Sequence, residues 1–135
     1  MKKLLFLPFL LIQTCFCIGQ ADTTRTEYLK KSSLHKLHFV FGNEEAEALA
    51  QYDWENGFPV LLLQSGNTPI RYSSDTVFEE KYKIRYFDYG CTGPNTEKIK
   101  AYNTIIFKRL SEKYGKKWRK TVRKDTLGLG KRNMN

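Results

Sequence analysis

The sequence predicts a small α/β fold: one domain of about three to four strands, in a mixed or parallel sheet, with a long C-terminal helix and a short basic helix. Short apolar runs alternate with segments of helical periodicity, and parallel strands need such helical crossovers. The 135 residues suffice for one modest core and are too few for two. The apolar patterning lies within residues 34–125, so we assign the single domain to that range.

The first nineteen residues have the pattern of an export signal. Lys2 and Lys3 form a positive start, residues 4–12 are almost wholly apolar, and Gly19 supplies a small residue for cleavage before Gln20. The apolar stretch is shorter than the roughly 20 residues that a transmembrane helix needs. The sequence therefore predicts a signal peptide over residues 1–19 and an exported, periplasmic or secreted protein.

Cleavage after residue 19 would decide how many of the three cysteines remain in the mature chain. Lipid attachment at Cys15 or Cys17 is an alternative, although neither follows the small residue that a lipoprotein signal requires. Loss of residues 1–19 leaves Cys91 alone, and no internal disulfide can then form. We expect a fold held by its core.

The start of the mature chain has two parts. Residues 20–33 are polar and predict a flexible lead-in. Residues 34–41 predict the first strand, because Leu37, Phe39 and Phe41 alternate with other side chains.

The middle of the chain supplies the remaining sheet. Each segment is bounded by Gly, Pro, Asn or Ser, which favour turns and caps. The expected elements are a helix over 44–56, a strand over 60–63 covered on both faces, a short edge strand or loop over 70–72, a helix over 75–82 and a strand over 83–89.

The last third predicts two helical segments. Asn95 or Thr96 caps the longest helix, over 97–114, whose apolar residues keep helical spacing. A second, basic helical segment covers 116–124, and the glycine-rich tail over 126–135 is expected to be disordered.

Three segments resemble one protein family. They are residues 78–82 (FEEKY), 83–91 (KIRYFDYGC) and 114–125 (YGKKWRKTVRKD). Together they resemble the bacterial FEKKY domain-containing proteins, with Glu80 where the family pattern has Lys. The likeness extends over roughly residues 37–128. It implies a small exported protein with one domain, and it implies no activity and no catalytic residue.

Positive charge gathers at the C-terminal end. Residues 113–135 hold nine basic side chains and one acidic one, whereas the rest of the mature chain is nearly neutral. We expect this segment to bind an anionic lipid, a glycan or an envelope protein; export makes nucleic acid an unlikely partner. The candidate anion-binding residues are Lys116, Lys117, Arg119, Lys120, Arg123 and Lys124.

The same segment has an apolar stripe. Tyr114, Trp118 and Val122 are spaced four residues apart. We expect Trp118 and Val122 to dock on the core. The alternative is an exposed stripe that joins the chain, as a subunit, to an envelope complex.

Cys91 is the one candidate nucleophile. It lies in a glycine-bracketed loop before the long helix, where a thiol can have a lowered pKa. Glu97 stands where a phosphatase loop needs Arg, and Pro94 where thioredoxin chemistry needs a second cysteine. A buried, inert thiol is the main expectation, and an enzyme with a Cys91 thiolate is the alternative.

No metal or cofactor is expected. His35 and His38 point to opposite faces if they lie on a strand, and no third ligand is evident. Asp53 and Glu55 are interpreted as surface charges. The combined expectation is a non-catalytic binding or interaction module.

Overall fold

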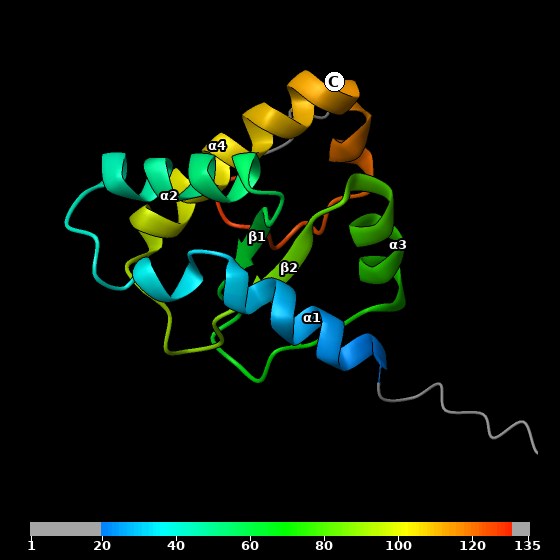
Figure 1. Cartoon of the computed structure of the whole chain (residues 1–135), viewed down its shortest axis with the longest axis horizontal. Coiled ribbons are helices and arrows are strands. Elements are labelled where there is room, and N and C mark those ends of the chain that lie inside the picture. Colours follow the sequence, from blue (N-terminus) through cyan, green and yellow to red (C-terminus); the bar gives the residue numbers. More distant parts are fainter. Residues whose placement is uncertain (1–19, 131–135) are drawn as a thin grey trace, which may run out of the picture.

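The structure is a computed structural model that describes residues 20–130. The predicted signal peptide, residues 1–19, lies outside the described residues. Figure 1 shows the arrangement of the helices and strands. In chain order they are α1 (Gln20–Lys31), the 3-10 helix η1 (Leu34–Lys36), α2 (Asn43–Glu55), β1 (Val60–Leu63), α3 (Ser73–Tyr82), β2 (Arg85–Asp88), α4 (Thr96–Tyr114) and the 3-10 helix η2 (Gly115–Lys120).

The two strands form the centre of a small single α/β domain. β1 and β2 are parallel, with Val60 opposite Arg85 and Leu63 opposite Asp88. Helix α3 provides the crossover between them. Every β1 residue is buried, which confirms a strand covered on both faces. Helices α2 and α4 pack together with α4 against β1, while α1 crosses the other side of the strands and α3 lies beside β2 (Figure 1).

The long helix α4 holds much of the core. The Asn95 side chain caps it by accepting a hydrogen bond from the Glu97 amide at 2.8 Å, as predicted. Its apolar stripe is buried from Ile99 to Leu110. It is not the last element, because η2 and a packed segment follow it.

The outer edge of β1 is closed by a side chain. Asn103 on α4 is fully buried. Its Oδ1 accepts from the Leu62 amide, and its Nδ2 donates to the Leu62 carbonyl, both at 2.9 Å. Nδ2 also donates to the Leu127 carbonyl at 2.8 Å. The carboxamide thus makes the two hydrogen bonds that a neighbouring strand would make.

The outer edge of β2 is closed in the same way by an ion pair. Glu79 Oε1 accepts from the Tyr86 amide at 2.8 Å, and the Arg25 guanidinium donates to the Tyr86 carbonyl. Both edges are therefore occupied by side chains. Within residues 20–130 the sheet has two strands, so the expectation of three to four strands is wrong.

Residues 34–41 do not form the predicted strand. Leu34, Leu37 and Val40 are the buried residues, whereas Phe39 and Phe41 are 77% and 94% exposed. Burial at every third position is the period of a 3-10 path, and η1 with its following turns adopts one. The alternation of 37, 39 and 41 was a misleading signal.

Residues 20–31, predicted as part of a flexible lead-in, form the helix α1. The segment has only a weak apolar stripe, so its order comes from tertiary contacts. Arg25 donates to Glu79 at 2.7 Å, and the Tyr28 hydroxyl donates to the Pro59 carbonyl at 2.8 Å. Both partners lie more than thirty residues further along the chain, beyond the reach of a local pattern.

Of the two alternatives predicted for residues 70–72, the structure has the loop and not the edge strand, and this loop leads into α3. The C-terminal tail differs from expectation. The tail is ordered as far as it is described: Thr126 is buried, and Leu127 and Leu129 pack on the core. Residues 131–135 of the predicted disordered tail lie outside the described residues.

Candidate functional site

The basic C-terminal segment is fixed to the core by Trp118. The indole is fully buried, is stacked on Phe107 with ring centroids 5.3 Å apart, and donates from Nε1 to Ser111 Oγ at 3.1 Å. Val122 is buried as well. The predicted docking of this stripe on the core is confirmed. An exposed stripe for a partner subunit does not exist, because its central residue has no free surface.

The six candidate basic residues divide into two groups. Arg119 lies over the Trp118 ring at 4.8 Å, and Arg123 is almost buried in ion pairs with Asp75 at 3.0 Å and Asp125 at 2.6 Å. The hydrogen bonds that Arg123 donates to the Asp125 carboxylate raise the pKa of Arg123. The remaining four are exposed and have no charged partner within residues 20–130; they are Lys116, Lys117, Lys120 and Lys124. The segment is shorter than predicted, a 3-10 helix over Gly115–Lys120 followed by turns.

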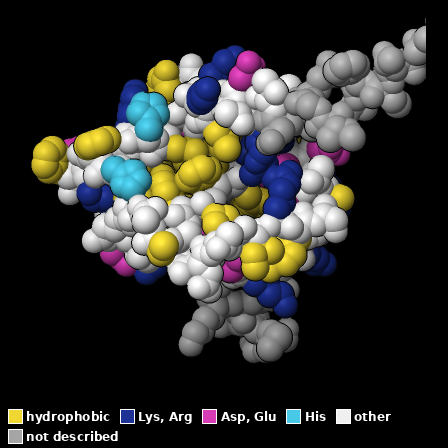
Figure 2. Space-filling model, turned by 90° about the horizontal axis from the view of Figure 1, so that it is seen from below, with side chains coloured by type: hydrophobic (Ala, Val, Ile, Leu, Met, Phe, Trp, Pro, Cys, Tyr) yellow, Lys and Arg dark blue, Asp and Glu magenta, His cyan; other side chains and the backbone are white. Residues whose placement is uncertain are grey.

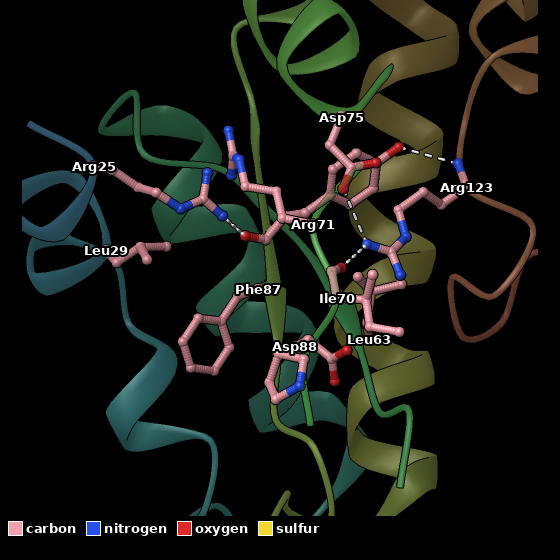
Figure 3. A pocket seen from close by; sticks show the side chains of 11 residues that line it. Arg25, Leu29, Leu63, Ile70, Arg71, Asp75, Phe87, Asp88 and Arg123 are labelled. Carbon is pink, nitrogen blue, oxygen red and sulfur yellow. Dashed lines mark hydrogen bonds and ion pairs between the residues drawn. The ribbon is translucent and has the colours of Figure 1, made fainter. Parts of the chain in front are cut away.

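A pocket opens at the carboxyl ends of the two strands, and we call it the strand-end pocket (Figure 3). Leu63 and Asp88, the last residues of β1 and β2, both line it. Its volume is about 330 Å³. Crevices at the carboxyl ends of parallel strands are the usual ligand sites of α/β sheets. Its other lining residues come from α1, the 69–71 loop, α3, β2 and the C-terminal segment.

Three arginines stand in its wall, and all are held by carboxylates. Glu79, 2% exposed, accepts from Arg25 at 2.7 and 2.9 Å and from Arg71 at 2.8 Å. Burial alone would raise the pKa of Glu79, but the hydrogen bonds from Arg25, the Tyr86 amide and Arg71 outweigh it and hold the pKa below its ordinary value. Arg123 is held by Asp75 as described above.

Two carboxylates in the same wall keep a free oxygen. Asp75 Oδ2 accepts from the Tyr72 amide at 2.9 Å and from Arg123, whereas its Oδ1 is buried without a partner. Asp88 Oδ1 accepts from the Ser65 and Gly90 amides, and its Oδ2 is buried without a partner. Buried acceptors normally receive a hydrogen bond, so these two oxygens are exceptions, and both belong to residues that line the pocket.

A second hollow of about 740 Å³ adjoins the strand-end pocket. The two share Leu29, Phe87 and Asp88, and the second is mainly apolar, with Leu34 and Tyr89 in its lining. Figure 2 shows this face: apolar side chains gather in a depression, with histidines along one side and basic side chains along the other. The two hollows thus form one continuous groove across the carboxyl edge of the sheet.

His35 and His38 both line the second hollow. The argument that they point to opposite faces fails, because their segment is not a strand. The His38 ring packs edge-on against Tyr89 with centroids 5.5 Å apart. Within residues 20–130 no three His, Cys, Asp or Glu side chains are grouped closely enough to hold a metal ion.

Asp53 is not the surface charge that the sequence indicated. It is fully buried on α2, and its carboxylate accepts from the Ser33 amide and hydroxyl, both at 2.8 Å, and from the Tyr102 hydroxyl. Burial raises its pKa, while the hydrogen bonds from Tyr102 and Ser33 act against that rise. Asp53 joins α2 and α4 to the end of α1, so its part is structural.

Cys91 is exposed, so the expectation of a buried thiol is wrong. It lies five residues before α4 begins at Thr96, outside the first turn of that helix. Its thiol has no hydrogen-bond partner within the described part of the chain. Neither a base nor a helix terminus is therefore placed to activate it.

In the full chain with Cys15→Ser and Cys17→Ser, we expect iodoacetamide to alkylate Cys91 at pH 7 at nearly the same rate in the native and urea-unfolded states. Exposure gives the reagent access, and a thiol without an activating neighbour reacts like one in a peptide. A mass-spectrometric time course of labelling measures both rates. Acceleration of more than about tenfold on unfolding would contradict an exposed Cys91; labelling about tenfold faster in the native state would favour the enzyme alternative.

The sequence indicated the lysines but not the strand-end pocket. Asp88 could have been found, because it is a carboxylate one residue before the end of the strand predicted over 83–89. Arg25, Arg71 and Asp75 carried no such signal, since they meet only through the packing of α1 and α3 beside β2.

No helix among residues 20–130 is both long and apolar enough to cross a membrane. No family model, curated protein or solved structure matches the chain.

Proposed function

We propose that this chain is an exported, non-catalytic binding module whose basic C-terminal segment contacts an anionic surface. The observation that carries the proposal is the set of four lysines, Lys116, Lys117, Lys120 and Lys124, which are exposed and without charged partners in the described chain. The acid next to Lys124 in sequence, Asp125, is already paired with Arg123 at 2.6 Å.

The placement of these lysines supports a surface contact. Four like charges within nine residues repel one another, and a layer of anionic headgroups or sulfated sugars relieves that repulsion. Trp118 holds the segment on the core, so the charges lie on an ordered support and lose little freedom on binding. A lysine near an anionic bilayer contributes about 1 kcal/mol, and four together make a useful affinity.

Two features of the sequence agree with this proposal. The pattern of residues 1–19 supports export. The resemblance to FEKKY domain-containing proteins supports a small exported domain, and the packing of its name-giving segment is consistent with it: Phe78, Glu79 and Tyr82 are buried, whereas Glu80 and Lys81 are exposed. A Glu in place of Lys at position 80 is therefore tolerable.

We expect the chain to bind vesicles that contain phosphatidylglycerol, and immobilised heparin, with an affinity that falls steeply between 50 and 300 mM salt. Substitution of the four lysines by Gln should weaken binding about 100- to 1,000-fold. Vesicle co-sedimentation and heparin chromatography measure the effect, and the stronger of the two identifies lipid or glycan as the source of the anion.

The matched control removes four exposed lysines elsewhere, Lys36, Lys81, Lys83 and Lys108, so that the net charge changes equally. It should keep most of the affinity. An affinity that does not change with salt, or an equal loss of affinity in both variants, would show that these four lysines form no specific binding surface.

A further inference from the structure

The strand-end pocket has an unusual balance of hydrogen-bonding groups. All three guanidinium groups in its wall already donate to carboxylates, whereas Asp75 Oδ1 and Asp88 Oδ2 are buried and accept nothing. Figure 3 shows Asp75 beside Arg123 at one end of the pocket and Asp88 at the other. A ligand can use these oxygens only if a carboxylate turns toward the pocket, and it must then donate a hydrogen bond to that carboxylate.

The charges around the pocket decide between ligand classes. An anion would meet guanidinium groups whose charge Glu79 and Asp75 already neutralise, and it would face the carboxylate of Asp88. A cation would meet three guanidinium groups. The positive groups are Arg25, Arg71 and Arg123, and the negative groups are Glu79, Asp75 and Asp88. Because these charges balance, a neutral ligand with both donors and acceptors suits the site best.

We infer that the strand-end pocket binds a neutral saccharide. Each sugar hydroxyl both donates and accepts, so one hydroxyl can donate to the carboxylate of Asp88 or Asp75 once it turns toward the pocket, while another accepts from the exposed edge of Arg71. This inference uses none of the four lysines and can hold or fail independently of the anionic-surface proposal.

The apolar part of the groove fits the rest of such a ligand. Phe87 and Leu29 are only partly buried and line both hollows. A pyranose ring has an apolar C–H face that packs on an aromatic side chain. The volumes, about 330 and 740 Å³, lie in the range of small-molecule sites. One sugar unit occupies the strand-end pocket, and further units lie along the second hollow.

The test uses the ¹⁵N-labelled full chain with four neutral probes: maltotriose, cellotriose, mannotriose and N,N′,N″-triacetylchitotriose. At least one should shift the Ser65 and Gly90 amides, which report on Asp88 because they donate to its Oδ1. Asp88→Asn replaces the free acceptor with a donor and should weaken that probe at least about tenfold. Glu112→Gln removes the same charge from an exposed helical ion pair and should leave the affinity unchanged.

A second variant keeps the inference testable if Asp88→Asn alters the fold, as its own amide spectrum would reveal. Phe87→Leu retains an apolar side chain but removes the stacking ring, and it should also weaken the probe severalfold. The inference is overturned if all four probes leave Ser65 and Gly90 unshifted at 20 mM, or if inorganic phosphate or butylammonium shifts these amides instead. Shifts that persist unchanged in both variants overturn it as well.

Discussion

Glu79→Ala should lower the free energy of unfolding by about 3 to 5 kcal/mol, the range for breaking a buried ion pair. The change leaves the buried Tyr86 amide without its acceptor and removes the carboxylate that Arg25 and Arg71 share. Arg71 is nearly half exposed and regains water, so the loss should fall toward the lower end of that range. Urea unfolding followed by circular dichroism measures it.

Glu80→Ala is the matched control, because Glu80 is the next residue on α3 and is exposed. Its effect should stay within about 0.5 kcal/mol. Equal losses in the two variants would mean that the ion pair of Glu79 contributes nothing beyond helix propensity.

The stability that Glu79 provides should also depend on pH. Its folded-state pKa lies below the ordinary value of 4.5, so its contribution is complete above pH 4.5 and is lost as the pH falls through the folded-state pKa. The gap between the native chain and Glu79→Ala should therefore narrow in acid. Asp53 has a raised pKa, so its effect on stability changes with pH in the opposite direction. Asp53 is present in both chains, and its effect therefore largely cancels when their stabilities are subtracted. A gap that widens below pH 4.5 would contradict this assignment.

Trp118→Ala should cost about 3 to 5 kcal/mol, as removal of a fully buried tryptophan usually does. The variant loses the stacking on Phe107 and the hydrogen bond to Ser111, and it leaves a cavity beneath η2. Thermal and urea unfolding measure the loss. Trp118→Phe keeps a ring and should cost clearly less, whereas Lys117→Ala, at an exposed neighbour, should change little. An unchanged stability in Trp118→Ala would mean that η2 is not docked on the core.

Local patterns predicted the elements that bury a regular stripe. The helix over 97–114, the buried strand over 60–63 and the helices on either side of that strand are all present, because apolar period and caps agree there. Helix α1 was missed because Arg25 finds its partner 54 residues away, and the strand over 34–41 was wrong because burial recurs there at every third residue.

The candidate sites divide along the same line. The sequence alone indicated the four exposed lysines of the C-terminal segment as candidates, and no charged partner in the described chain changes that prediction. Arg123 looked like one of that group, yet it is paired with Asp75, which is 48 residues away in sequence. The strand-end pocket depends on α1, the 69–71 loop, α3 and the C-terminal segment, which reach the strand ends only in the fold. Features that depend on nearby residues were predicted from the sequence, and features that depend on residues far apart in the chain were not.

The closed sheet edges have a consequence for self-association. A strand with unpaired amides and carbonyls recruits strands from other molecules, and a two-stranded sheet has such an edge on each side. Here Asn103 occupies one edge, and Glu79 with Arg25 occupies the other. These polar side chains therefore block the pairing of strands between molecules, as well as stabilising the fold. Loss of either would leave a chain that retains much of its core yet gains a template for aggregation.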